Sequence, residues 1–184
     1  GVFPSLSLMQ NAPERALRLL LSEKAQGEGV EKLREICRQY HVREEVADKA
    51  LSRISGKQNC FAAVVFEKWQ SDLKKDAPHV VLHHPMDEGN LGTIQRTLLG
   101  LGIEDIAIIR PAVDSDDPRV TRASMGAAFS LNVRHFDFFD QYRAEFPERQ
   151  LFPFMLTGAV PLDEAVKKVS GPFSLIMGNE ASDL

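Results

Sequence analysis

The sequence predicts an α/β fold in which a parallel sheet covered by helices follows a smaller α/β unit. From residue 79 onward, short apolar runs rich in β-forming residues alternate with segments of helical spacing. The strand candidates are apolar on both faces, which is typical of parallel sheets with helices on both sides. The polar segment 70–78 (QSDLKKDAP), which ends in proline, separates this rhythm from the first part of the chain. We therefore predict two domains, residues 1–72 and 78–184.

The first domain is predicted to be a small α/β unit. Residues 15–21 (RALRLLL) form an apolar run that is too short to distinguish a strand from the start of a helix. Residues 30–40 have the spacing of an amphipathic helix, and residues 46–54 repeat that pattern on a smaller scale. Residues 60–66 (CFAAVVF) are continuously apolar and are expected to form a buried strand.

The second domain is predicted to contain the parallel sheet. Its strands are expected at residues 79–83, 105–109, 130–133, 151–157 and 173–177. Its helices are expected at residues 91–101, 119–128, 138–146 and 162–169. Ligands of such sheets bind where the carboxyl ends of strands lead into helices, so the loops at that edge are where we expect a site.

The composition is that of an ordinary globular protein. Of the 184 residues, 43% are apolar and 26% are charged, which excludes a disordered chain, a collagen-like repeat and a fibrous coil. No run approaches the ~18–20 apolar residues of a membrane span, so no membrane partner is expected. The first residues lack the basic start and apolar block of a signal peptide, so we expect a cytoplasmic protein. Cys37 and Cys60 form no CxxC pair and have no His at metal spacing, so we expect reduced thiols and no metal.

The net charge of −4 hides an asymmetry along the chain. Residues 1–77 carry 13 Lys and Arg against 11 Asp and Glu, which gives +2. Residues 78–184 carry 9 against 15, which gives −6. This division permits contact between the front part and a polyanion, but charge alone does not distinguish it from an ordinary solvated surface.

A chemically unusual loop follows the first strand of the predicted sheet. The segment 84–96 (HPMDEGNLGTIQR) leads directly into a helix, which either Asp87 or Asn90 can cap. The free amides of a helix N-terminus favour an anion, and Arg96 lies within the first two turns. In the simpler interpretation, Asn90 only caps the helix and Arg96 pairs with Glu88 or with solvent.

Two glycines in this loop allow another backbone or a ligand to come close, at Gly89 and Gly92. The GNLG sequence does not match the GxGxxG fingerprint of dinucleotide-binding proteins. The chain also lacks the GxxxxGK[ST] sequence of a P-loop. Neither of these phosphate-binding chemistries is therefore supported.

A second unusual loop follows the last predicted strand. In the segment 171–184 (GPFSLIMGNEASDL), an apolar strand leads into Gly-Asn-Glu. An amide and a carboxylate are therefore expected at the carboxyl end of that strand. In isolation, Glu180 could simply be an acid that caps a helix.

The two loops, about ninety residues apart and in this order, resemble the first two motifs of the SPOUT-superfamily, TrmH-like (SpoU) RNA 2′-O-ribose methyltransferases. That family shows Asn-x-Gly-x-x-x-Arg and then Gly-x-Glu after two of its strands. The segment 122–129 (RASMGAAF) also resembles the Ser-x-Gly-Ala helix of the family. The matching residues are Asn90, Gly92 and Arg96 in the first motif and Gly178, Asn179 and Glu180 in the second.

The sequence departs from the family pattern in two places. Ala181 and Asp183 stand where the second motif usually continues with glycines. The third motif, of the type Ser-Leu-Asn-Val, does not follow the second; residues 130–133 (SLNV) spell it but precede that motif, and we interpret them as an internal strand. We expect the C-terminal helix and half of the family's trefoil knot to lie beyond Leu184, so the knot is expected to be incomplete in this chain.

The resemblance implies S-adenosylmethionine as methyl donor and a ribose 2′-hydroxyl of RNA as nucleophile, with ribosomal RNA favoured over transfer RNA. Members of the family are described with the arginine of the first motif activating that hydroxyl, but a guanidinium is a poor base, so we expect Arg96 to clamp the phosphate or ribose. We expect Asn90 to orient Arg96 or the ribose, and Glu180 to fix these groups or to accept the proton. The implied cofactor-binding residues are Leu175, Ile176, Met177, Gly178 and Asn179.

The resemblance also implies a homodimer whose front domain holds RNA, as a small ribosomal-protein-like domain does in many members. Arg119 and Arg122, one helical turn apart, are candidate contacts to RNA phosphates, although a solvated face explains them equally well. The departures from the motifs favour an alternative function, an RNA-binding protein that retains the SPOUT fold without catalysis.

Two further clusters attract attention as metal sites. His83 and His84 are adjacent and would face opposite ways in a strand, so both cannot ligate one metal. Asp114, Asp116 and Asp117 resemble a cation-binding loop. Because Asp117 directly precedes a proline, we expect it to cap a helix instead.

Overall fold

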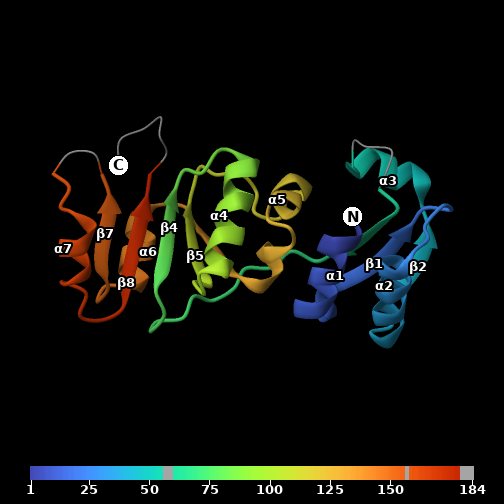
Figure 1. The fold of residues 1–184 in the computed structure, drawn as a ribbon, viewed down its shortest axis with the longest axis horizontal. Helices are drawn as coiled ribbons and strands as arrows, with labels where there is room; N and C mark the ends of the chain where they lie inside the picture. The colour runs from blue at the N-terminus through green and yellow to red at the C-terminus, as the bar shows by residue number, and fades with distance from the viewer. Residues whose placement is uncertain (56–59, 156–157, 179–184) are drawn as a thin grey trace.

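The computed structural model describes residues 1–55, 60–155 and 158–178, and the structural statements below concern these residues. Two β-sheets follow one another along the chain and lie side by side in an elongated molecule (Figure 1). The first has three strands in the order β2-β1-β3, and the second has five in the order β6-β5-β4-β8-β7. No described helix is long and apolar enough to span a bilayer.

The front unit surrounds the three-stranded sheet. Its elements are α1 (Val2–Asn11), a 3-10 turn (Pro13–Arg15), β1 (Ala16–Leu21), α2 (Glu28–Gln39), β2 (Arg43–Val46), α3 (Asp48–Ser55) and β3 (Ala62–Phe66). The apolar run left undecided between strand and helix is the central strand β1, parallel to β2 and antiparallel to β3. Sequence reasoning missed β2, because this exposed edge strand (REEV) has no apolar alternation, and it also missed α1.

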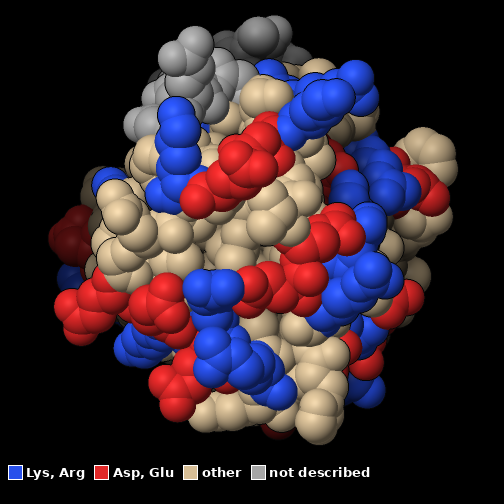
Figure 2. All heavy atoms as spheres, turned by 90° about the vertical axis from the view of Figure 1, so that its right-hand side faces the viewer, with Lys and Arg blue, Asp and Glu red and all other residues tan. Residues whose placement is uncertain are grey.

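The surface of the front unit carries both signs of charge. Arg34 pairs with Glu44 (2.5 Å) and Glu31 (3.4 Å), and Arg18 pairs with Glu45 (3.3 Å). Figure 2 shows Lys and Arg interspersed with Asp and Glu on the end of the molecule formed by this unit. The excess of positive charge in this part of the sequence therefore does not form a continuous basic patch on that face.

The back unit contains the parallel sheet that the sequence predicts. Its strands are β4 (His79–His83), β5 (Asp105–Ile109), β6 (Asn132–Phe136), β7 (Gln150–Phe154) and β8 (Phe173–Met177). Its helices are α4 (Glu88–Gly100), α5 (Pro118–Ala123), a 3-10 turn (Ala127–Ser130), α6 (Phe139–Glu145) and α7 (Leu162–Val166). The bounds of β4, β5 and β8 coincide with the predicted ones.

The region between β5 and β6 differs from the prediction. The single helix predicted for residues 119–128 is wrong, because α5 ends at Ala123 and the backbone of Met125 (φ 54°) and Gly126 (φ 86°) turns left-handed. A 3-10 turn follows, so β6 begins at Asn132, two residues later than predicted, and continues to Phe136. It lies at one edge of the sheet.

The core of the back unit has one layer on each face of the sheet. Alternate residues of each strand point to opposite faces, so Val80 and Leu82 pack with Leu91 of α4, while Val81 packs with Tyr142 of α6. Helices α4 and α5 therefore cover one face and α6 covers the other (Figure 1). Full burial of each large aliphatic side chain contributes about 1.5–3 kcal/mol, so this sheet is a rigid support for its loops.

A buried polar network closes the amino end of the same sheet. The hydroxyl of Tyr142 lies 2.9 Å from Nδ1 of His79 and 2.6 Å from Oγ of Ser174. Arg149, which is 6% exposed, donates to Ser174 Oγ from Nε at 2.9 Å. Its other nitrogens donate to the carbonyl oxygens of Lys75, Ala77 and Phe173. Arg149 therefore ties the segment before β4 to the start of β8.

The two units touch through α1. Ser7 Oγ donates to the carbonyl oxygen of Gly126 at 2.8 Å, and a Cβ on Gly126 would lie 2.7 Å from Cβ of Ser7. Phe129 packs against Trp69 beside this contact, with ring centroids 6.3 Å apart. The polar segment predicted to separate the domains lies against the back unit, because its Leu73 is buried in the core on one face of the sheet.

Candidate active site

A hollow of about 480 Å³ lies at the carboxyl ends of the neighbouring strands β4 and β8. His83 ends β4 and lines one side of the hollow, and Met177 and Gly178 line another. The first turns of α4 contribute Asn90 and Thr93. The tertiary structure thus places the start of α4 and Gly178, the residue after β8, at the same hollow.

The start of α4 decides which residue caps the helix. Asp87 Oδ1 accepts a hydrogen bond from the backbone N–H of Asn90 at 2.6 Å, so Asp87 is the N-cap. The interpretation of Asn90 as the cap is therefore wrong. Since capping does not use its side chain, Asn90 is available at the edge of the hollow.

Arg96 lies on the exposed surface of α4, beside the hollow and outside its lining. Glu88, its expected partner in the simpler interpretation, pairs instead with Arg119, with Nη2 and Oε1 2.6 Å apart. Within the described part of the chain, Arg96 has no ion pair or hydrogen bond. Of the two alternatives in the simpler interpretation, pairing with Glu88 is therefore wrong and exposure to solvent remains, so the guanidinium is available to a ligand.

Gly92 lets α4 pack closely against α5. A Cβ at this position would lie 2.5 Å from Cβ of Ala123, 2.6 Å from the carbonyl oxygen of Val120 and 2.8 Å from the backbone nitrogen of Ser124. The sequence allowed two reasons for this glycine, the close approach of another backbone or of a ligand. The structure shows the first, since the backbone of α5 approaches Gly92. The motif glycine therefore acts through helix packing.

Replacing Gly92 with alanine is expected to lower the free energy of unfolding by about 1–3 kcal/mol, because the added methyl group overpacks the contact between two helices. Gly100 offers a matched control in the same helix, since a Cβ there meets nothing within 4 Å. Gly100→Ala should leave stability unchanged or raise it by up to about 1 kcal/mol. Urea denaturation of both variants measures the difference. Equal stability of the two would contradict the packing role.

Strand β8 carries most of the residues expected to bind a cofactor. Leu175 and Met177 pack toward the α4 side of the sheet and Ile176 toward the α6 side. Of these, Met177 reaches the hollow, where it is joined by Gly178. Leu175 and Ile176 pack in the core layers of the sheet and do not line the hollow. Asn179 and Glu180 lie outside the described residues.

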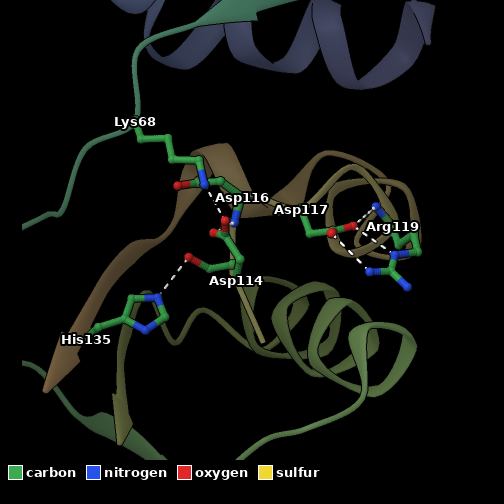
Figure 3. A network of polar contacts seen from close by, with 7 residues as sticks. Lys68, Asp114, Asp116, Asp117, Arg119 and His135 are labelled. Carbon is green, nitrogen blue, oxygen red and sulfur yellow. Dashed lines mark hydrogen bonds and ion pairs between the residues drawn. The ribbon is translucent and has the colours of Figure 1, made fainter. Parts of the chain in front are cut away.

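Arg119 and Arg122 differ in their surroundings. Arg119 forms an ion pair with Glu88. It is also held by Asp117, whose Oδ1 accepts from Nε at 3.1 Å (Figure 3). Arg122 is exposed and forms no ion pair within the described ranges. Asp117 also accepts from the backbone N–H of Arg119 at 2.7 Å and caps α5, which confirms its expected role.

The acidic loop before α5, which contains Asp114 and Asp116, makes its polar contacts within the protein. Lys68 pairs with Asp114, whose Oδ1 also accepts from the backbone N–H of Asp116 (Figure 3). Burial, together with the charge of Asp114, raises the pKa of the Asp116 carboxyl to about 6. Over the described residues, no group of three or more His, Cys, Asp or Glu side chains is arranged to hold a metal ion.

The expectation that His83 and His84 face opposite ways is wrong. Their ring centroids lie 3.9 Å apart with the ring planes at 32°. His84 follows the end of β4 and has a left-handed backbone (φ 54°), which breaks the alternation of the strand. Both rings line the hollow. The sequence signal for this was weak, since it consists only of the two adjacent histidines at the end of a strand.

Comparison with known proteins identifies the family. A model of the SpoU rRNA methylase family matches residues 77–184. The chain belongs to this family. The match covers the parallel sheet and both loops at the hollow, and it confirms the resemblance carried by the two motifs.

Curated relatives match part of this SpoU-family chain. Mouse mitochondrial rRNA methyltransferase 3 is 35% identical over 71 residues, which are 33% of this chain and 17% of the relative. An uncharacterised tRNA/rRNA methyltransferase of Synechocystis is 33% identical over 92 residues, 50% of this chain and 34% of the relative. The matched region thus spans about a third or less of the length of these relatives.

Solved structures share the whole fold. An rRNA methyltransferase of Sinorhizobium meliloti superposes with a TM-score of 0.80 at 24% identity, covering 100% of this chain and 71% of that one. An AdoMet-bound rRNA methyltransferase from the same organism superposes with a TM-score of 0.76 at 25% identity, and the match covers 96% of this chain and 69% of that one. The SpoU methyltransferase AviRb of Streptomyces viridochromogenes superposes with a TM-score of 0.79 at 22% identity, and the match covers 100% of this chain and 72% of that one. The predicted SPOUT-type α/β fold is confirmed.

Proposed function

We propose that this chain transfers a methyl group from S-adenosylmethionine to a ribose 2′-hydroxyl of structured RNA, ribosomal rather than transfer RNA. The observation that carries the proposal is the hollow lined both by Asn90 of the first motif and by Gly178 of the second. Such a crevice at the carboxyl ends of parallel strands is where sheets of this kind bind ligands. The AdoMet-bound relative of the same fold supports the choice of cofactor.

The hollow suits S-adenosylmethionine in size and chemistry. Its volume lies within the range of about 300–1,000 Å³ typical of small-molecule sites. Leu82, Ile94 and Met177 offer apolar surface, and Gly178 leaves space at the end of β8. When bound, the cofactor supplies a methyl group activated by a sulfonium. We propose that Met177, Gly178 and the neighbouring Asn179 hold its adenosine part.

Methyl transfer to a hydroxyl depends chiefly on alignment, which this chain's own residues would provide. A guanidinium stays protonated and is a poor base, so we assign Arg96 to clamping the phosphate or ribose. Asn90 at the edge of the hollow would orient the ribose. Glu180 is proposed to fix these groups.

The placement of RNA is also a proposal. Arg122, exposed and unpaired within the described ranges, suits a phosphate contact better than Arg119, whose charge is already compensated. We propose that residues 1–72 hold the RNA, as the resemblance of the sequence to the family implies, and we propose a homodimer by analogy with the family. The free thiols of Cys37 and Cys60 suit a reducing compartment, which supports a cytoplasmic location.

Two measurements test the proposed function. Titration calorimetry should detect binding of S-adenosylmethionine to the purified protein, and mapping of ribose methylation should reveal an unmethylated ribosomal nucleotide in a strain lacking the gene. The purified protein should restore that methyl group on RNA from this strain. If RNA binds but the cofactor does not, the alternative of a non-catalytic RNA-binding protein is correct.

A further inference from the structure

The two histidines at the hollow have no role in the function described so far. His83 ends the central strand β4, whose backbone is bonded to β5 on one side and β8 on the other. The backbone of His83 itself is paired with Ile109 of β5. The hollow that it lines also contains Asn90 and Gly178. An imidazole is thus held between the two motif loops.

The nitrogens of His83 are placed asymmetrically. Nδ1 is enclosed by the protein and has no hydrogen-bond partner among the described residues. This leaves Nε2 as the nitrogen that a molecule in the hollow can reach. The tilted ring of His84 lies against one side of the His83 ring, at a centroid distance of 3.9 Å, and restricts its rotation.

The surroundings keep His83 uncharged at neutral pH. Burial and then the adjacent His84 lower the pKa of its imidazole, because protonation would put a charge in an enclosed place and beside a second ring. Of the residues that the structure describes, Asp87 is the carboxylate that lines the hollow, and it accepts a hydrogen bond from the N–H of Asn90 as the helix cap. Among the described residues, β8 and Gly178 contribute no titratable group to the hollow.

We propose that Nε2 of His83 is the general base that accepts the proton of the ribose 2′-hydroxyl during methyl transfer; this rests on the proposed function. The ribose oxygen forms the new bond to the methyl carbon while the carbon–sulfur bond breaks and its electron pair remains on sulfur. The hydroxyl proton passes to Nε2, and the resulting imidazolium later releases it to water. Arg96 cannot perform this step because it is already protonated.

The test compares the wild-type protein with His83→Gln in single-turnover methyl transfer. Ribosomal RNA from the deletion strain is the methyl acceptor and S-adenosylmethionine is saturating. A positioned base contributes about 10²–10⁴-fold, so the variant should lose that much rate while its affinity for S-adenosylmethionine, measured by calorimetry, stays close to wild type. A loss of cofactor affinity that accounts for the whole loss of rate would overturn the proposal.

The pH profile gives a second readout that needs no variant. Protonated His83 cannot accept a proton, so the wild-type rate should rise with pH through the pKa of His83 and be constant above it. Because that pKa is lowered, the inflection should fall below ~6.5, the ordinary value for imidazole. The inflection should disappear in His83→Gln between about pH 5 and 8. A wild-type profile without an inflection would overturn the proposal even if the variant does not fold.

His135 provides the matched control. It lies near the carboxyl end of β6, which is separated from β4 by β5, and it is partly buried with a pKa that burial also lowers. It lies outside the hollow, and its Nε2 is 3.0 Å from Oγ of Ser115. His135→Gln should keep both the rate and the inflection, and an equal loss in this variant would overturn the proposal. If the wild-type protein makes no 2′-O-methylated nucleoside, the proposed function itself fails. If the wild-type protein does make it and His83→Gln is equally active, only the role of His83 fails.

Discussion

Replacing Arg96 with alanine is expected to reduce methyl transfer by about 10²–10³-fold with little change in cofactor affinity or stability. Arg96 is exposed, and among the described residues it has no hydrogen-bond or ion-pair partner whose loss would destabilise the fold. It lies beside the hollow rather than in its lining, so cofactor binding should not depend on it. A contact made chiefly in the transition state lowers kcat more than it weakens binding.

Arg96→Lys should recover little of the lost activity, because an ammonium keeps the charge and loses the planar, two-pronged fork. Lys168→Ala, which removes an exposed cation beyond α7, should transfer methyl groups at the wild-type rate. Single-turnover assays and thermal unfolding of all three variants provide the comparison. Full activity in a stable Arg96→Ala protein would exclude Arg96 from the reaction.

Replacing Arg149 with leucine is expected to lower the free energy of unfolding by about 3 kcal/mol or more. The substitution removes every hydrogen bond that the guanidinium donates, and it leaves the carbonyl oxygens of Lys75, Ala77 and Phe173 without this donor. For a chain of this size each kcal/mol lowers Tm by roughly 2–4 °C, so a shift of at least about 6 °C should be seen by calorimetry.

Arg143 on α6 is the control for this effect, because its side chain makes no hydrogen bond or ion pair with another described residue. Arg143→Leu should change stability by no more than about 0.5 kcal/mol. Arg149 lies at the amino end of the sheet, opposite the hollow, so the folded fraction of Arg149→Leu should keep its methyl-transfer rate. Similar stability of the two leucine variants would show that the buried network contributes little.

The elements that the sequence determined best are the three interior strands of the five-stranded sheet, β5, β4 and β8. The runs that form β4, β5 and β8 are apolar at nearly every position because these strands are covered on both faces, and their bounds were predicted correctly. The motif loops could also be located from the sequence, because a strand that ends abruptly in polar and glycine residues marks the edge of the sheet. Asp117 as a helix cap also followed from local sequence, because capping involves only the next few residues.

The tertiary structure alone decided every feature that depends on a partner far along the chain. Gly92 is required by α5, and the charge of Glu88 is taken by Arg119 instead of Arg96. Asn90 and Gly178 line one hollow only because β4 and β8 are neighbours in the sheet, and no periodicity in the sequence encodes that order of strands. Local propensity acts over a few residues, whereas the identity of a side chain's neighbours is settled when distant segments pack.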